Sequence, residues 1–219
     1  MSRLARQLLT NRAGVAMIEF ALSVPLLMTA GLWGTELANL ALTHLQVNQA
    51  AVHLADNLSR IGETSQLANH RIYEGDIDDI LKGASIETAS LGLFDHGRVI
   101  ISSLEVDSHN RQYIHWQRCK GLKSWPSHYG GLGRVPGGVG IGPPGEEVIA
   151  PKDGAVMFVE LVYDYQPLIS AQWVGNTTIS STASFMVREN RDLSKLYQAS
   201  SASPSPVAAC ANHDSFPTS

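Results

Sequence analysis

The chain has 219 residues, enough for one folded domain with appendages but too few to suggest two full domains. Its formal net charge of −4 is spread along the chain without a basic block, which argues against a nucleic-acid-binding protein. Hydrophobic residues make up an ordinary 44% of the chain, so their uneven placement is more informative than their number. Most of that unevenness lies in residues 1–60.

The N-terminal segment predicts one long helix whose first half spans a membrane. Between Val15 and Leu42 the only ionisable side chains are Glu19 and Glu36. The apolar run with its flanks is long enough to cross a hydrocarbon core about 30 Å thick. Further along, apolar residues recur at alternating steps of three and four, which places them on one face of a continuing helix. These residues are Leu37, Leu40, His44, Val47, Ala51, Leu54, Leu58 and Ile61. Gly62 is suited to cap the helix C-terminus.

Three interpretations of this segment compete. A cleaved secretory signal would end at a small-residue cleavage site and give way to an unrelated sequence, whereas here the helical pattern continues. The other two are a plain membrane anchor and an anchor with an additional role. Arg3, Arg6 and Arg12 precede the apolar run without any acidic residue. That bias predicts a cytoplasmic N-terminus, with the rest of the chain outside.

Glu19 and Pro25 are the unusual residues of the apolar run. A carboxylate at the centre of a membrane helix costs about 2.5 to 3.5 kcal/mol on insertion scales, so something should compensate Glu19. In a purely structural interpretation its side chain reaches the lipid headgroups or pairs with Arg12. Pro25 is compatible with a transmembrane kink, because membrane helices accept proline more readily than soluble helices do.

The residues around this glutamate resemble a known family. Residues 12–22 read RAGVAMIEFAL, and they are followed by PLL at 25–27 and then by Gly34 and Glu36. This pattern resembles the N-terminus of TadE-like proteins, which are minor pilins or pseudopilins of the bacterial tight-adherence (Flp, type IVc) pilus system. In that family an aspartic prepilin peptidase cuts after a glycine that stands five residues before a glutamate followed by an aromatic residue.

Gly14, Glu19 and Phe20 occupy those places here. The resemblance therefore implies cleavage after Gly14, a mature protein beginning at Val15, and a single pass through the bacterial inner membrane with a periplasmic C-terminal domain. It also implies an assembly role for Glu19 and Phe20, with the glutamate matched by the N-terminal amine of a subunit. A matched pair would fix axial register, while a mismatched one would be expensive. The implied partners are the prepilin peptidase, other pilins, assembly-platform proteins and membrane lipid.

Residues 63–189 predict a small α+β domain. A short helix is expected at residues 76–81, closed by Gly83. Four strands are expected, at residues 98–106, 111–119, 155–165 and 177–187. The turn-forming residues 107–110 predict a hairpin between the first two strands, and the third strand is expected to bury only one face. Together these elements indicate a pilin-like α+β fold, in which the long helix covers a small antiparallel sheet.

Two segments are expected to lack regular structure. Residues 121–151 are rich in glycine and proline, which predicts an exposed loop that could serve as a contact surface. Residues 190–219 are rich in serine, alanine and proline, which predicts a disordered tail. The loop contains a GxGxxG pattern at residues 140–145, but Pro143 and Pro144 interrupt it, so no nucleotide cofactor is expected.

The chain has only two cysteines, Cys119 and Cys210. In an exported protein they can form one disulfide, which would stabilise the fold by about 4 to 5 kcal/mol in the chain-entropy model. Two unpaired thiols, with Cys210 in a mobile tail, are the equal alternative. The nearest approach to a metal cluster is His109, His115 and Cys119, but residues on a hairpin need not face the same side, so no metal site is expected.

The sequence lacks the GxSxG, P-loop and Cys–His patterns of common enzymes, so no enzymatic activity is expected. The leading hypothesis is a TadE-like assembly protein with a cytoplasmic leader at residues 1–14 and an N-terminal helix at 15–62. The alternative is a single-pass anchored binding module, unrelated to pili, that contacts its partner through residues 121–151. An anchored periplasmic enzyme is a third hypothesis, without a supporting constellation.

Overall fold

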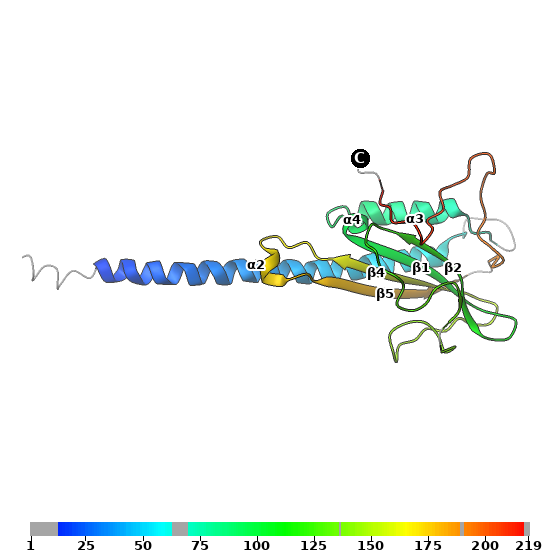
Figure 1. The fold of residues 1–219 in the computed structure, drawn as a ribbon, viewed down its shortest axis with the longest axis horizontal. Coiled ribbons are helices and arrows are strands. Elements are labelled where there is room, and N and C mark those ends of the chain that lie inside the picture. The colour runs from blue at the N-terminus through cyan, green and yellow to red at the C-terminus, as the bar shows by residue number, and fades with distance from the viewer. Residues whose placement is uncertain (1–12, 63–69, 136, 189–190, 217–219) are drawn as a thin grey trace, which may run out of the picture. The chain divides into compact units, whose positions relative to one another are not determined.

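The computed structural model describes residues 13–62, 70–135, 137–188 and 191–216 of the chain. Within these residues the chain forms one long helix, shorter helices and an antiparallel sheet, which confirms the predicted α+β class (Figure 1). The elements are α2 (Ala13–Arg60), α3 (Glu74–Glu87), α4 (Leu93–His96), β1 (Gly97–Val106), β2 (Gln112–Lys120), β3 (Gly133–Arg134), β4 (Val156–Asp164), α5 (Ala171–Val174) and β5 (Thr178–Met186). Two compact units result: residues up to 42 with 167–175, and residues 43–166 with 176–219.

Helix α2 contributes to both units, and it passes through Pro25 without interruption. The predicted apolar face is buried over its C-terminal turns, at Val47, Ala51, Leu54, Leu58 and Ile61. Leu37 and His44 belong to the same pattern but are exposed, so the packed stretch is shorter than predicted. Gly62 follows the helix with a φ of +89°, in the left-handed region that the predicted C-terminal cap requires.

The sheet has the strand order β3-β2-β1-β4-β5, and all neighbouring strands are antiparallel. The predicted hairpin is present, because Val106 of β1 lies opposite Gln112 of β2. Its turn is closed by the Asp107 carboxylate, which accepts hydrogen bonds from backbone N–H groups of the turn and from the Arg111 side chain. The hydrogen bond from the Arg111 side chain lowers the pKa of Asp107 to about 2.

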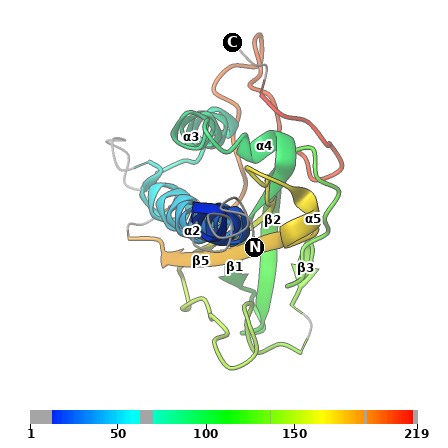
Figure 2. The ribbon, with the colours of Figure 1, turned by 90° about the vertical axis from the view of Figure 1, so that its left-hand side faces the viewer.

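Helix α3 is longer than the short helix predicted at residues 76–81. Gly83 lies inside α3 on its exposed side and does not end it. The C-terminal turns of α2, residues 43–60, and helix α3 lie on the same face of the sheet (Figure 2). The two helices contact each other where His53 Nδ1 lies 2.5 Å from Glu87 Oε1. This helical layer covers one face of β1 and β4.

The other face of the sheet is covered by the glycine- and proline-rich loop. Val135, Ile141 and Ala150 of this loop are buried, and they pack in one apolar cluster with Phe158 of β4. Strand β4 is therefore buried on both faces, and the prediction that only one of its faces is buried is wrong. The prediction of an exposed loop at residues 121–151 is wrong for this inner part. A short strand in this loop, β3, extends the sheet by pairing with the edge of β2.

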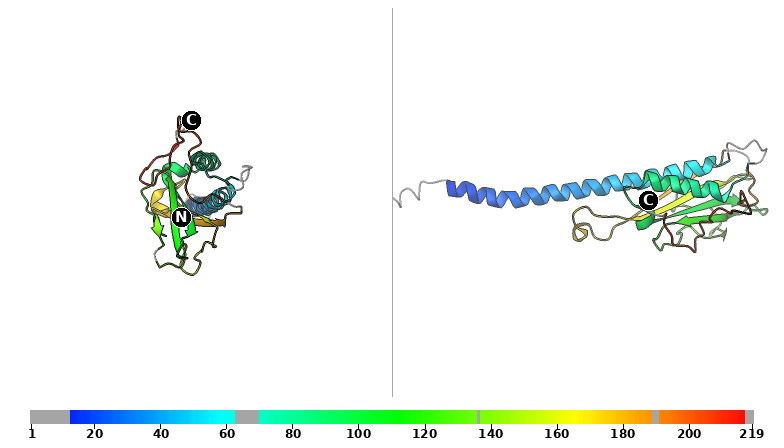
Figure 3. Two further views of the ribbon diagram at one scale, coloured as in Figure 1. Left: turned by 90° about the vertical axis from the view of Figure 1, so that its right-hand side faces the viewer. Right: turned by 90° about the horizontal axis from the view of Figure 1, so that it is seen from above.

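The C-terminal segment, residues 191–216, packs against the domain, in contrast to the disorder predicted for it (Figure 3). A disulfide joins Cys119 to Cys210, so the structure has the first of the two cysteine alternatives. The buried guanidinium of Arg98 donates hydrogen bonds to the carbonyl oxygens of Gly121, Asn212 and Cys210, at 3.0, 3.1 and 2.6 Å. These contacts involve residues far apart in the chain, and the tail's composition does not reveal them.

We expect the disulfide to contribute a measurable part of the free energy of unfolding. In the chain-entropy model, replacing both Cys119 and Cys210 by alanine lowers the free energy of unfolding by about 4 to 5 kcal/mol, because the unfolded chain is released from a long closed loop. Guanidinium unfolding of the full chain in detergent, followed by tryptophan fluorescence, measures this loss. The wild type under reducing conditions is the control and should lose a similar amount. A double variant within 1 kcal/mol of the oxidised wild type, a margin set by the ~10–15% extrapolation error, would contradict the prediction.

Candidate functional site

The predicted processing segment lies in the first turns of α2. Gly14, Val15, Glu19 and Phe20 are all exposed, with 54% of Val15 and 69% of Phe20 accessible. Val15 and Glu19 are four residues apart and therefore lie on one face of the helix. The arginines at positions 3, 6 and 12, on which the predicted orientation depends, lie outside the described residues.

The apolar part of α2 is the one stretch in the described chain that is long and apolar enough to cross a membrane, judged by length and composition. None of its most apolar window is buried by the rest of the chain. Its hydroxyl groups are hydrogen-bonded within the helix: Ser23 donates to Phe20 O at 3.2 Å, Thr29 to Pro25 O at 2.7 Å and Thr35 to Gly31 O at 3.0 Å. Such internal bonds leave few polar groups that need water.

Nothing in the described chain requires a glycine at position 14. A Cβ atom at this position would meet no other atom within 4 Å, and its φ is not in the left-handed region. A helical glycine is nevertheless about 1 kcal/mol less favourable than alanine. The intramolecular packing of the protein therefore does not explain this residue.

Glu19 has no hydrogen-bond or ion-pair partner in the part of the chain that the structure describes. Its carboxylate is exposed among apolar neighbours, including Met17, Ile18 and Phe20, which are 76%, 63% and 69% accessible. A carboxylate in such surroundings is stable in water but not in hydrocarbon, where it needs a hydrogen-bond donor or a cation. If this part of the helix is in a membrane, the partner of Glu19 lies outside the described residues: Arg12, the lipid headgroups or another protein.

Glu36, the second acidic residue of the apolar segment, differs from Glu19 because it is buried and has hydrogen-bond donors within the described chain. It is only 2% exposed, and its carboxylate accepts hydrogen bonds from the backbone N–H groups of Leu168 at 3.3 Å and Ile169 at 2.8 Å. One turn earlier, Trp33 stacks on Trp173 of α5, with ring centroids 6.3 Å apart and planes inclined by 23°. The loop between β4 and β5 is thus attached to α2 at two points.

Sequence reasoning missed this cluster, although three signals of it are present. Glu36 interrupts an apolar segment without a cation nearby in the sequence, which calls for a donor. No Asp, Glu, Lys or Arg occurs between Asp164 and Arg188, so the β4–β5 loop is uncharged throughout. The loop is also longer than the two to five residues usual for a hairpin, and long ordered loops are commonly functional.

The base of this loop is closed by a charged contact. Lys123 Nζ lies 2.5 and 2.6 Å from the two carboxylate oxygens of Asp164, and the Thr178 hydroxyl donates to the same group at 2.7 Å. Burial raises the pKa of Asp164, but the hydrogen bonds from Lys123 and Thr178 lower it by more, so the net shift is downward. The carboxylate form is therefore favoured where the loop leaves the sheet.

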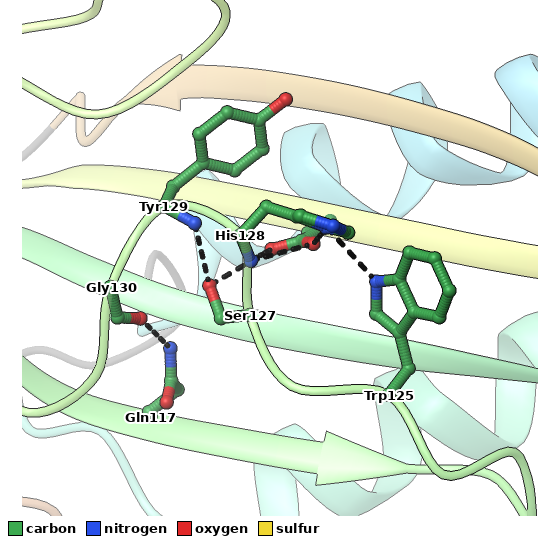
Figure 4. A network of polar contacts seen from close by, with 7 residues as sticks. Gln117, Trp125, Ser127, His128, Tyr129 and Gly130 are labelled. Carbon is green, nitrogen blue, oxygen red and sulfur yellow. Dashed lines mark hydrogen bonds and ion pairs between the residues drawn. The ribbon is translucent and has the colours of Figure 1, made fainter.

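A second polar network holds the other long loop on the sheet (Figure 4). Glu160 of β4 is buried and accepts hydrogen bonds from the Ser127 hydroxyl at 2.9 Å and the His128 backbone N–H at 3.1 Å. Trp125 Nε1 donates to His128 Nδ1 at 3.1 Å. In a catalytic Ser–His–carboxylate triad the serine is bonded to the histidine, whereas Ser127 is bonded to Glu160, so the geometry favours a structural role.

Among the described residues there is no group of three or more His, Cys, Asp and Glu side chains placed to hold a metal ion. The two histidines closest to such a group in sequence have separate contacts, His109 with Ser108 and His115 with Glu105. Cys119 is engaged in the disulfide. An open depression of about 630 Å³ between α3, α4 and Phe216 has a mainly apolar lining with a single carboxylate, that of Asp95, so it offers no pair of carboxylates for general acid–base chemistry.

Comparisons with known proteins do not identify the chain. No protein-family model matches it, and neither a curated protein nor a solved structure does. The exposed apolar helix with Glu19 and the Glu36 cluster therefore remain the features from which a function can be inferred.

The Glu36 contacts predict that this carboxylate orders the β4–β5 loop. Replacing Glu36 by alanine should speed hydrogen exchange of the Leu168 and Ile169 amides by about 10- to 100-fold, because each loses a charged acceptor worth about 1.5 to 3 kcal/mol. Exchange followed by mass spectrometry on the detergent-solubilised chain measures this change. Ser170→Ala is the matched control, since it removes a different acceptor in the same loop, that of the Gln172 N–H. Unchanged exchange in the Glu36 variant would contradict the assigned role.

Proposed function

We propose that the chain is a single-pass protein of the bacterial inner membrane and a TadE-like minor pilin or pseudopilin that acts in assembly of a tight-adherence pilus. In this proposal a prepilin peptidase removes residues 1–14, and residues from Val15 to about 35 cross the membrane. The second unit of the structure is then periplasmic. The proposed partners are other pilins and the assembly platform.

The observation that carries the proposal is that the two halves of α2 have different surroundings. Its first half is apolar and exposed, while its last turns form part of the domain core. A secretory signal is removed from the protein it exports, whereas this segment continues without a break into residues that the fold needs. A helix that serves as both anchor and core element supports a permanently attached domain.

Gly14 and Glu19 support the pilin-like part of the proposal. Neither residue is explained by contacts within the described chain, and both are accessible to another protein. A peptidase that cuts between Gly14 and Val15 would account for the glycine. The amine released at Val15 would be a cation, and a cation of this kind on a neighbouring subunit would neutralise Glu19 in the membrane.

The alternative, an anchored binding module that uses residues 121–151, has less support. The inner side chains of that loop cover the sheet, and its polar anchor at Glu160 is directed inward. Its outer side leaves scattered apolar side chains exposed, of which Leu132 and Val139 are each 68% accessible. Single exposed apolar residues are common on protein surfaces and do not define a binding site.

Processing predicts a defined N-terminus. Mass spectrometry of the membrane-extracted protein should find a chain that begins at Val15 when a prepilin peptidase is present and an intact leader when it is absent. Gly14→Val should block the cut, because it adds bulk at the scissile residue. Gly31→Val is the matched control, since Gly31 is another exposed helical glycine without neighbours. An intact Met1 in peptidase-containing cells would favour the plain anchor, and a cut near Ala30 would indicate an ordinary secreted protein.

The proposed role of Glu19 predicts that replacing this residue impairs assembly without impairing membrane insertion. Glu19→Ala should leave insertion intact or improve it, because a carboxylate is removed from the apolar segment. It should reduce recovery of the protein in pilus or assembly-platform fractions by about tenfold or more, as expected when the partner of a buried ion pair is left unmatched. Fractionation with immunodetection measures both quantities. Ser23→Ala, a polar-to-alanine change on the same helix, is the control, and equal assembly of the two variants would count against the pilin-like role.

A further inference from the structure

The apolar surface of the first unit does not end where helix α2 meets its first polar contacts. It continues onto the β4–β5 loop, where Leu168 is 65%, Ile169 38% and Trp173 39% accessible. On the helix beside them, Leu32 is 42% and Trp33 50% accessible. A contiguous exposed patch of large apolar side chains marks an interaction surface more often than scattered residues do.

The position of Trp33 along the helix indicates the partner of this surface. From Val15 to Trp33 an α-helix rises by about 27 Å, close to the thickness of about 30 Å of the hydrocarbon core. Trp33 therefore falls at the far boundary of a span that begins at Val15. Tryptophan is enriched at this boundary, because its ring is apolar and its N–H group needs a polar partner. Trp173 stacks on Trp33 and comes to the same level of the span.

The polar groups around Glu36 are buried and hydrogen-bonded, as a position at the membrane boundary requires. The Glu36 carboxylate lies within one turn of Trp33, and it is 2% exposed beneath the backbone N–H groups of Leu168 and Ile169. These hydrogen bonds hide the charge and also satisfy two loop amides, and an irregular backbone near hydrocarbon needs both. The loop itself has no Asp, Glu, Lys or Arg side chain that would disfavour its contact with lipid.

We propose that the β4–β5 loop, residues 167–175, is an interfacial membrane anchor that inserts Leu168, Ile169 and Trp173 into the headgroup region of the outer leaflet beside Trp33. The inference rests on the proposed membrane span, and it adds a second point of attachment to it. Lipid is favoured over another protein because the patch is continuous with the helix surface that lies in lipid, at the depth where tryptophan is enriched.

Quenching of tryptophan fluorescence by brominated lipids tests this location. The full chain is reconstituted into phosphatidylcholine vesicles with bromine either high or low on the acyl chains, and the wild type is compared with Trp33→Phe and Trp173→Phe. The quenched fluorescence intensity should fall by about half in each variant, because each variant removes one of the two tryptophans that lie at the interface, out of four in the chain. Shallow bromines should quench more than deep ones. Circular dichroism establishes that each variant is folded.

A pair of added reporters makes the test specific to the loop. In the Trp173→Phe background, Leu168→Trp should restore the lost quenching. Ile86→Trp on α3, where the native side chain is 79% exposed, should not restore it. If Trp33 is quenched but Trp173 and the residue-168 reporter are not, the loop contacts water or another protein, and the inference fails while the span stands. If none of them is quenched, the span itself fails. Equal quenching of the residue-86 reporter would also overturn the inference.

Discussion

If α2 spans a membrane, its residues up to about 35 must be stable in hydrocarbon, while residues 43–60 of the same helix must pack on a β-sheet in water. A helix can do both, because its backbone groups are hydrogen-bonded internally in either solvent. What changes along the helix is the side chains. Hydroxyl groups in the N-terminal half donate to the carbonyl groups of the helix itself, whereas apolar side chains of the C-terminal turns are buried in the domain core. The domain core and the anchor depend on this single element.

The sequence was informative wherever the determinants are local. The three-and-four spacing from Val47 to Ile61 follows from helix geometry, and these residues are buried on one face of α2. The four long strands also lie close to their predicted residues. The hairpin was predictable because its turn residues are adjacent in the chain. The pattern that contains Gly14 and Glu19 is likewise contiguous in the sequence. Their proposed roles involve other proteins, so a single chain cannot confirm them.

The features that could not be predicted are those that join distant segments. Glu36 was visible as a charge, but its donors at Leu168 and Ile169 lie more than a hundred residues further along. The glycine-rich loop appears exposed from its composition, yet a few side chains, such as Ile141, are enough to seal the second face of the sheet. Glycine and proline describe how a segment turns, and they carry little information about what it covers.

Arg98 has a consequence for the order of events in folding. Its guanidinium lies inside the domain, and it donates to the carbonyl groups of Cys210 and Asn212, which are more than a hundred residues further along the sequence. Because the chain is made from its N-terminus onward, these residues follow the last strand of the sheet, β5. Without them the buried guanidinium keeps Gly121 O but loses two carbonyl acceptors, and such a state is disfavoured. This part of the domain therefore closes only when the segment around Cys210 has packed against the sheet.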